Sequence, residues 1–427
     1  MSSESMSNPA RTLPSPFRWL CAACLTVMAF SWLFAAFYYR HTSTEWASVW
    51  SHDPADAFGD FLNYSDLFRV FHTPAFFFSE ERFAYPAPSA VVFSWLYHMG
   101  PYQLQIFLGS IIAAGLAACT LFRNALVRSG VAALPATLFA AGMALSSWPL
   151  LFLYERANLE FVIWLLAALG IWALVRERPM LAAILFGLAA SLKLYPILLL
   201  ALLFSRRHIR EFCAGMATFA LAFVASLWFV GPTMGMALHG TLSGINGFVT
   251  NYAATAHSEL LLDHSFLGAI KQILTQPPWL RSDFTFLTHA YVIGAGLGAT
   301  LLFLLRVRHL PFVNRVLFLT ICMVALPPVS YDYTLVHLCV PFALFTLAAV
   351  RTSHQGDRQP GLALALICFG ILFTPQLFLF WDTLHLNGLL KAAAMATLVV
   401  LLSVNPVIEL DTHTFTAVED DVDAVYA

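Results

Sequence analysis

The chain has 427 residues, of which 59% are apolar and only 11% carry a charge. Such a composition excludes an ordinary soluble globular protein and predicts an all-α polytopic membrane protein. The formal net charge of −2 says little about partners, and we expect no nucleic acid among them. The 7 cysteines fall almost entirely in apolar runs without metal-ligand or disulfide spacing, so we predict no metal and no cofactor.

Apolar runs of about 17 to 25 residues, the length that a bilayer requires, recur along the chain. The first run, residues 17–38, is too long and too aromatic for a cleaved signal, so we expect an uncleaved first span. Further spans are predicted at residues 101–122, 131–151, 157–175, 211–230, 286–305, 312–329, 334–350, 360–380 and 388–404.

The apolar stretch 180–204 is interrupted by Lys193, Leu194, Tyr195 and Pro196. Proline removes a backbone donor and disfavours helix directly before it, and a broken backbone at membrane depth is tolerated where it lines a cavity. We therefore predict two half-helices that enter and leave on the same side of the membrane. The alternative is a single kinked crossing. With the hairpin counted as two, the sequence predicts about twelve membrane or half-membrane segments.

Positive residues stay preferentially on the cytoplasmic side of a membrane. With the hairpin, one topology places all the basic loops and both chain termini in the cytoplasm. The basic loops contain Arg123, Arg128, Arg176, Arg178, Arg206, Arg207, Arg210, Arg306, Arg308, Arg315, Arg351 and Arg358. Residues 1–404 then form one membrane domain, and the acidic tail 405–427 is expected to be a disordered cytoplasmic extension.

The same topology leaves two long loops on the extracytoplasmic side, at residues 40–88 and 231–285. We expect the first loop to be helical and to hold the chemistry, because carboxylates beside a bilayer suit a site where a polar reactant meets a membrane lipid. Its carboxylates belong to Asp53, Asp56, Asp60, Asp66, Glu80 and Glu81. Solvated surface charge and helix capping are the alternative roles for these side chains.

Charged residues inside apolar segments indicate function, because a charge at the bilayer centre costs about 2.5 to 3.5 kcal/mol. Lys193 is the clearest case, and we predict that it receives an anion such as phosphate; snorkelling to the interface is the alternative. Arg156 is a second candidate for a phosphate or substrate contact, unless it forms a local ion pair with Glu155 or Glu160. His337 is expected about one turn below the membrane surface, where a bond to a neighbouring carbonyl is the alternative.

An ordered series of short motifs runs through the chain. Its members are Asp60 to Tyr64, Tyr85 to Pro88, Asn158 at the start of a span, Gly187 to Pro196, and Ser330 to Tyr333. The series resembles the polytopic polyprenyl-phosphate-sugar glycosyltransferases of the GT-C superfamily. The closest resemblance is to glycosyltransferase family 87, which includes bacterial α-1,2-mannosyltransferases and related arabinofuranosyltransferases.

The resemblance implies a GT-C-like bundle in the bacterial inner membrane, with a catalytic acidic residue in the first outer loop. Carried over by position, Asp60 takes the place of the catalytic aspartate, and Lys193 takes that of the lysine in the Lys-X-X-Pro element. The chain departs from the family's pattern at Ala87, which separates the usual two prolines. It departs again at Glu155 to Ala157, where small residues are usual, and this bears on the donor or acceptor more than on the reaction class.

The residue chemistry agrees with sugar transfer from a polyprenyl-phosphate-linked donor to a hydroxyl of a glycolipid or glycan acceptor. Asp60 is predicted to take the acceptor proton in a single displacement with inversion. Cations are predicted to meet the leaving phosphate, and polar or aromatic side chains to hold the substrates. The phosphate-binding residues are predicted to be Lys193, Arg156 and His337, and the substrate-binding residues Tyr64, Tyr85, Asn158, Asp332 and Tyr333.

Two functions of other classes fit the same features. A transporter or flippase of a lipid-linked or polar solute would use Lys193 and His337 as coupling or substrate sites. A membrane scaffold subunit would have no catalytic use for them. Release of free lipid phosphate from a polyprenyl-phosphate sugar distinguishes a transferase from both.

Overall fold

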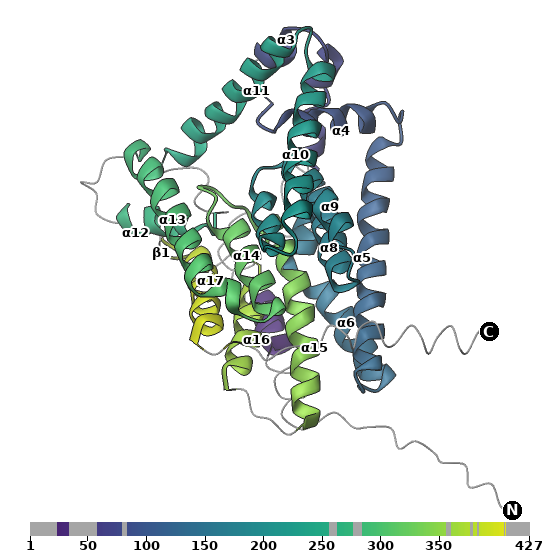
Figure 1. The fold of residues 1–427 in the computed structure, drawn as a ribbon, viewed down its shortest axis with the longest axis vertical. Helices are drawn as coiled ribbons and strands as arrows, with labels where there is room; N and C mark the ends of the chain where they lie inside the picture. The colour runs from purple at the N-terminus through teal and green to yellow at the C-terminus, as the bar shows by residue number, and fades with distance from the viewer. Residues whose placement is uncertain are drawn as a thin grey trace, which may run out of the picture.

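The computed structural model describes residues 24–33, 58–78, 83–255, 263–275, 284–355, 360–375, 379–381, 384–404 and 406. Over these residues the protein is a bundle of helices that stand side by side (Figure 1). In the described ranges the named strands are one short antiparallel pair, β1 (Leu379–Trp381) and β2 (Leu384–His385). The predicted all-α class is therefore confirmed.

Four helical stretches in the described part of the chain are long and apolar enough to cross a membrane. They are α5 (Gln103–Arg128), α10 (Ile209–Val230), α13 (Thr285–Leu305) continued by η4 (Val307–His309), and η5 (Asp332–Leu338) continued by α15 (Cys339–Gln355). A fifth candidate is the pair α6 (Ala133–Ser146) and α7 (Trp148–Arg156), which is bent by 47°. Pro149 lies in the first turn of α7, where its missing N–H removes no helical hydrogen bond, so a new helix begins there.

The outward faces of the long helices are apolar. Trp228 of α10 is 73% exposed and Leu305 of α13 is 75% exposed, and both lie among other exposed aliphatic side chains. Soluble proteins rarely expose apolar surface of this extent to water, whereas a membrane protein buries such surface in lipid. These faces support the expected integral membrane protein.

The remaining apolar helices are shorter. They are the helix Cys24–Leu33, α4 (Ala87–Tyr97), α8 (Glu160–Val175), α9 (Pro179–Leu192), α14 (Phe312–Ala325), α16 (Pro360–Leu372) and α17 (Leu386–Val404). The predicted count of about twelve spans is not confirmed. Hydropathy detects an apolar run, but it does not show where the helix inside that run is interrupted. Pro327 and Pro328 follow α14, and every residue of that helix from Val316 to Ala325 is buried. A helix enclosed by protein does not need the length of a bilayer.

The interrupted stretch predicted as a hairpin does reverse direction. α9 ends before Lys193, whose backbone is extended, and the 3₁₀ helix η2 (Tyr195–Leu203) follows. A methyl group built on Gly215 of α10 would lie 3.0 Å from the carbonyl oxygen of Ala183 and 2.4 Å from Cδ2 of Leu200. In one continuous helix those two residues would be about 25 Å apart. The two halves therefore lie antiparallel, and the single kinked crossing is excluded.

Helices from both long loops gather towards one end of the bundle, with α3 and α11 at its tip (Figure 1). The first loop contributes α2 (Gly59–Leu62), η1 (Leu67–Val70) and α3 (Ala75–Phe78), and the second contributes α11 (Met234–Phe248), η3 (Val249–Ala253) and α12 (Phe266–Leu274). α11 packs closely on the first loop, because a methyl group on Gly240 would lie 2.2 Å from the Phe77 ring. The described part of the first loop holds three four-residue helices joined by turns, and its predicted place outside the cytoplasm stays a prediction.

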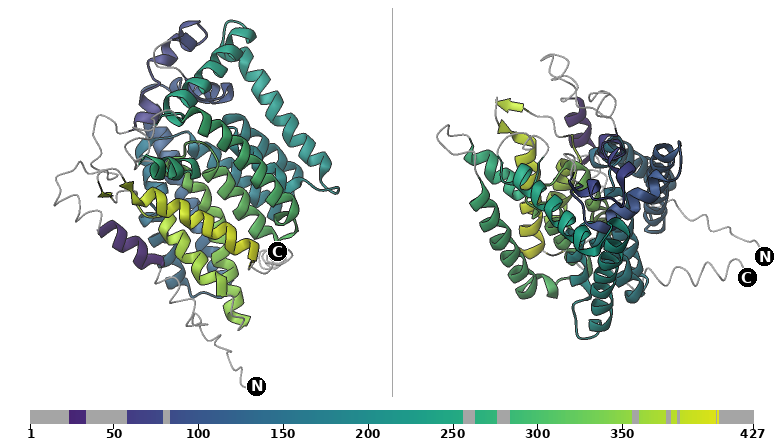
Figure 2. Two further views of the ribbon diagram at one scale, coloured as in Figure 1. Left: turned by 90° about the vertical axis from the view of Figure 1, so that its left-hand side faces the viewer. Right: turned by 90° about the horizontal axis from the view of Figure 1, so that it is seen from above.

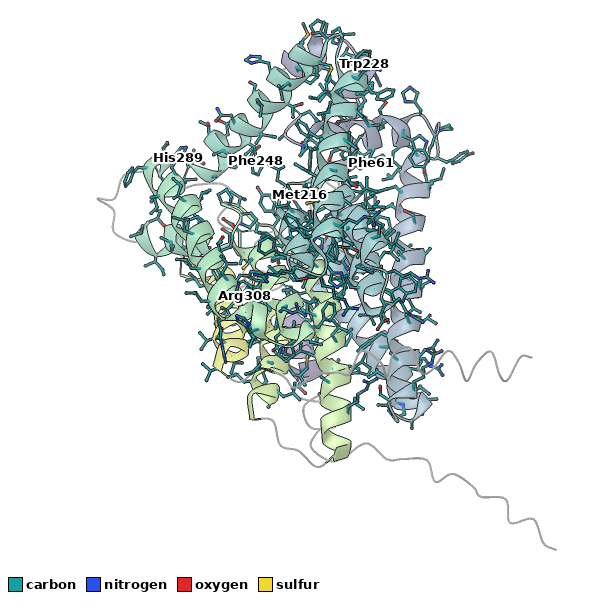
Figure 3. The ribbon with its side chains drawn as sticks, in the orientation of Figure 1. Phe61, Met216, Trp228, Phe248, His289 and Arg308 are labelled. Atoms are coloured by element: carbon teal, nitrogen blue, oxygen red, sulfur yellow. The ribbon has the colours of Figure 1, made fainter. Side chains whose placement is uncertain are left out.

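One basic loop, that of Arg308, lies away from the first loop along the bundle. Figure 3 places Phe61 of the first loop level with His289, at the start of α13, and Arg308 well below them. The helix Cys24–Leu33 lies beside α16, where a methyl group on Gly370 would be 3.3 Å from the sulfur of Cys24 (Figure 2). α17 packs next to α16 and α14.

Candidate active site

Asp60 lies in the short helix α2, which is fixed against the C-terminal end of α7. Phe58 has a left-handed backbone (φ 61°), and its N–H donates to the carbonyl oxygen of Glu155 at 2.8 Å. The buried ring of Phe61 stacks on Phe107 with a centroid distance of 5.4 Å. These contacts hold α2 in place while 18% of the Asp60 side chain remains exposed.

Three N–H donors orient the Asp60 carboxylate. Arg156 reaches Oδ1 with Nη2 at 2.7 Å and with Nε at 3.2 Å, and Asn158 Nδ2 reaches Oδ2 at 2.7 Å. Both partners lie on the same short connection, because Ala157 takes a left-handed conformation (φ 48°) that ends α7. The carboxylate is therefore held in one orientation and is still accessible.

Asn158 connects Asp60 to a second carboxylate, that of Glu160. The Asn158 Oδ1 accepts the backbone N–H of Glu160 at 2.8 Å, which satisfies one of the open donors at the start of α8. Glu160 lies in the first turn of α8, where the helix dipole favours negative charge. Asp60, Asn158 and Glu160 thus form one continuous polar network.

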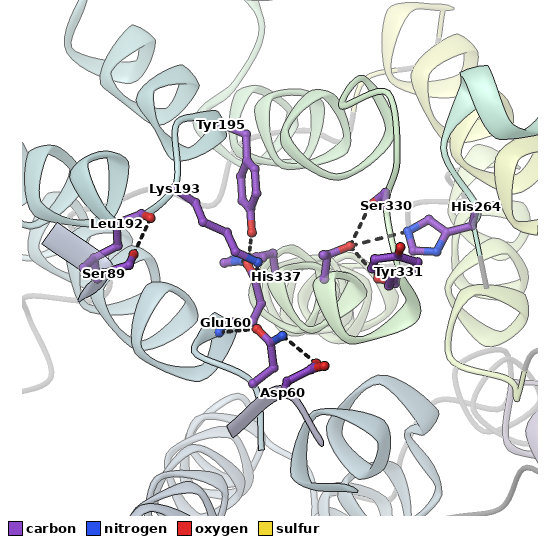
Figure 4. A network of polar contacts seen from close by, with 12 residues as sticks. Asp60, Ser89, Glu160, Leu192, Lys193, Tyr195, His264, Ser330, Tyr331 and His337 are labelled. Carbon is purple, nitrogen blue, oxygen red and sulfur yellow. Dashed lines mark hydrogen bonds and ion pairs between the residues drawn. The ribbon is translucent and has the colours of Figure 1, made fainter. Parts of the chain in front are cut away.

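Three donors converge on the Glu160 carboxylate (Figure 4). Lys193 Nζ lies 2.6 Å from Oε2, His337 Nε2 lies 2.5 Å from Oε1, and the Tyr195 hydroxyl donates to the same Oε1. Lys193 and Tyr195 come from the turn between α9 and η2, and His337 comes from η5. The Glu160 side chain is 0% exposed, so its charge is balanced entirely by groups of the protein.

Three aromatic rings surround the Lys193 ammonium group. Its Nζ lies 5.2 Å from the ring centroid of Tyr85, 5.4 Å from that of Tyr333 and 5.8 Å from that of Tyr195. The ring faces attract the cation. Burial, with a smaller contribution from the charge of Asp60, raises the pKa of Tyr85, so its hydroxyl stays neutral and can donate. The Lys193 side chain is 14% exposed, so it is not completely enclosed by protein.

α4 positions two parts of this arrangement. Tyr85 directly precedes the helix, and Ser89 in its first turn donates to the carbonyl oxygen of Leu192 at 2.6 Å (Figure 4). Leu192 is the last residue of α9. The bond therefore fixes the chain directly before Lys193.

The structure brings the predicted phosphate-binding residues together, with partners that the sequence did not indicate. Arg156 forms an ion pair with Asp60 of the first loop. The ammonium group of Lys193 is bonded to Glu160 and so points into the protein instead of extending outward. His337 bonds the same carboxylate through Nε2.

The predicted substrate-binding residues fall into two groups. Tyr64 packs on Tyr85 with a centroid distance of 5.9 Å, and Tyr333 stacks on Phe152 at 6.0 Å, so these aromatic residues line the region around Lys193. Asp332 differs, because its side chain is 0% exposed. In this arrangement it has no surface to offer a substrate, and the predicted substrate contact does not fit the structure.

The sequence reasoning missed the central position of Glu160 and gave no role to Lys391 and His264. The sequence did contain a signal for Glu160 and for Lys391. Glu160 opens one apolar run and Lys391 interrupts another, so both meet the criterion that selected Lys193. No feature of the local sequence distinguishes His264 from the other histidines of its loop.

The other acidic residues of the first loop are not part of this network as far as the chain is described. Asp66 is exposed and pairs with Arg69 at 3.2 Å, a surface ion pair of the kind worth about 0 to 1 kcal/mol. The remaining ones lie outside the described residues, as do residues 407–427 of the predicted tail. Those undescribed loop residues are Asp53, Asp56, Glu80 and Glu81.

Comparison with known proteins gives a match at the family level. Residues 83–327, more than half of the chain, match the family model described as glycosyltransferase family 87. The matched region includes Asn158, Glu160 and Lys193, whereas Asp60 and His337 lie outside it. No curated protein and no solved structure gives a significant match.

Proposed function

We propose a specific reaction from the premise that this chain belongs to glycosyltransferase family 87 and is a GT-C-type membrane glycosyltransferase. The protein transfers a hexose or pentose from a polyprenyl-phosphate-linked donor to a hydroxyl group of a lipid or glycan acceptor. Transfer takes place on the extracytoplasmic side of a bacterial inner membrane, by single displacement with inversion. The observation that carries this proposal is the continuous polar network from the accessible Asp60 to the caged ammonium group of Lys193.

Asp60 serves as the base. It takes the proton of the acceptor hydroxyl while the hydroxyl oxygen attacks the anomeric carbon, so the two groups must come within about 3 Å of each other. Arg156 and Asn158 fix the orientation of the carboxylate. Oδ1 accepts two N–H groups of Arg156 and Oδ2 accepts one of Asn158, so a lone pair of Oδ2 remains for the incoming proton. The exposed edge of Asp60 is where the acceptor approaches.

Lys193 serves the leaving group, whereas His337, which is 2% exposed and bonded through Nε2 to Glu160, holds that carboxylate in place. The bond between the anomeric carbon and the phosphate oxygen breaks, its electron pair stays on the lipid phosphate, and the negative charge there increases. An ammonium group has three N–H donors, and in Lys193 one of them points at Glu160, so the others can face the phosphate. Donors that are in place before the reaction stabilise this charge without reorganisation.

The direct test uses purified protein in lipid vesicles with a radiolabelled polyprenyl-phosphate sugar. We expect free lipid phosphate to be released as the label moves to an acceptor extract. If the donor instead crosses the vesicle membrane intact, the protein is a flippase and the proposed reaction is wrong. Stereochemistry at the transferred sugar, read by NMR of the product, tests the inversion.

Replacement of Lys193 by alanine is expected to weaken donor binding. A hydrogen bond from a charged group contributes about 1.5 to 3 kcal/mol, which corresponds to a roughly 10- to 150-fold higher Kd for the donor. Binding is measured with the labelled donor under conditions that prevent transfer. Arg123→Ala, at a half-buried arginine that bonds neighbouring side chains, provides the control. A normal donor affinity of Lys193→Ala would show that Lys193 pairs with Glu160 but does not bind the donor.

A further inference from the structure

A second buried polar network lies at the start of η5. Asp332 Oδ2 accepts hydrogen bonds from Trp148 Nε1 and from Lys391 Nζ, each at 2.7 Å. The other oxygen, Oδ1, lies 3.1 Å from His264 Nδ1. The side chains of Asp332, Lys391 and His264 are all 0% exposed. The proposed reaction uses none of these four residues directly.

The partners of Asp332 come from parts of the chain that are far apart in sequence. Trp148 begins α7, Lys391 lies in α17, and His264 precedes α12 in the second long loop. A buried ion pair is weak as a source of stability, because removing both charges from water costs about as much as their attraction returns. The ion pair matters more for geometry, because three donors together hold the Asp332 carboxylate in a single position.

The residues that follow Asp332 reach into the active site. Tyr333 places its ring 5.4 Å from Lys193 Nζ, and His337 bonds Glu160 at 2.5 Å. Both belong to the same seven-residue 3₁₀ helix as Asp332. A displacement of the start of η5 therefore moves both groups.

One face of α7 runs alongside η5 and provides a second connection between the buried network and the candidate active site. Trp148, Phe152 and Arg156 are four residues apart, so they lie on the same face of the helix. Trp148 bonds Asp332, and Phe152 stacks on Trp148 at 5.3 Å and on Tyr333 at 6.0 Å. Arg156 then bonds Asp60. The same helix face thus links the buried network to the proposed base.

We propose that four residues form a positioning network for the active site: Asp332, Lys391, His264 and Trp148. The network fixes η5 against α7, and η5 in turn holds Tyr333 beside the Lys193 ammonium group and His337 on the Glu160 carboxylate. Asp332 is a positioning residue in this scheme and does not touch substrate. The inference rests on the proposed function, because it requires that the region of Lys193 binds the donor.

The decisive variant is the double substitution Asp332→Asn/Lys391→Met. It removes the ion pair and leaves no unpaired buried charge, so the protein is expected to fold, as checked by size-exclusion chromatography and Tm. We expect kcat per folded molecule to fall roughly tenfold or more, within the range that a misplacement of 1 Å causes. A purely structural role would lower the folded fraction and leave kcat per folded molecule unchanged.

Lys271→Met is the matched control. Lys271 is also a buried lysine, but its Nζ bonds the carbonyl oxygens of Ala253 and Thr255 and is no part of the network. We expect its kcat per folded molecule to equal that of the unsubstituted protein. An equal loss of kcat per folded molecule in Lys271→Met and in the double variant would overturn the inference. Replacing any buried lysine would then lower kcat to the same extent.

The remaining outcomes separate this inference from the proposed function. A double variant with full kcat in an active protein would overturn the positioning network alone. An unsubstituted protein that releases no lipid phosphate would overturn the proposed function and this inference with it.

If the double variant does not fold, Trp148→Phe replaces it, since it removes one donor to Asp332 and keeps a ring against Phe152. Its kcat is expected to fall severalfold, and an unchanged kcat would overturn the network.

Discussion

Replacement of Asp60 by asparagine is expected to lower kcat about 10²- to 10⁴-fold, the range that a general base contributes. Asparagine has nearly the same shape, and its amide oxygen can still accept from Arg156. Its NH2 group cannot accept from Asn158, and the neutral side chain cannot take the proton of the acceptor hydroxyl. Expression and donor binding are therefore expected to stay close to those of the unsubstituted protein. The measurement is initial-rate transfer at saturating donor, together with the donor Kd.

Asp66→Asn is the control for this substitution. It lies in the same loop and loses the same charge, but its ion pair with Arg69 is exposed and unconnected to the polar network. We expect unchanged transfer. If Asp60→Asn keeps substantial activity, Asp60 is not the base; if Asp66→Asn is the inactive variant, the base is Asp66.

Replacement of Glu160 by glutamine is expected to lower kcat/KM about 100-fold and to lower Tm. The Glu160 carboxylate holds Lys193, Tyr195 and His337 in one position, and loss of its charge releases the lysine from that position. Breaking a fully buried ion pair costs about 3 to 5 kcal/mol, and the cost is smaller here because 14% of the Lys193 side chain is exposed. Transfer kinetics and thermal unfolding in the same detergent measure the two effects.

A second variant separates catalysis from stability at Glu160. The double substitution Glu160→Gln/Lys193→Met leaves no unpaired charge, so it is expected to regain most of the lost Tm and to stay inactive. Glu211→Gln serves as the control, because Glu211 lies 3.9 Å from His208 on a partly exposed face of α10. Normal transfer by Glu160→Gln would show that the cage around Lys193 does not need its carboxylate.

The sequence singles out Asp60 and Lys193 as candidates because each has a local signal, and their roles stay predictions. Asp60 stands in an acidic loop after an apolar run, and Lys193 stands beside Pro196 inside another. The local sequence did not indicate, however, which side chains these two residues contact. Arg156 was expected to bind phosphate or a neighbouring glutamate, and the structure pairs it with Asp60, 96 residues earlier in the chain.

The number of membrane spans could not be predicted for a related reason. A run of apolar residues fits a lipid-facing helix and a helix enclosed by protein equally well. α14 is enclosed on nearly all sides, and α6 and α7 divide one apolar run at a bend of 47°. Only the packing of neighbouring helices decides which runs must reach across a bilayer.

By itself, the sequence determined the membrane class, the all-α fold, the hairpin at residues 193–196 and the candidate base. Composition and proline act locally, so they can be read without knowledge of the rest of the fold. The tertiary structure alone decided that three donors meet on Glu160 and that Asp332 is buried beside Lys391. His337 and Glu160 are 177 residues apart in sequence, and only the packing of η5 against α8 brings the two side chains together.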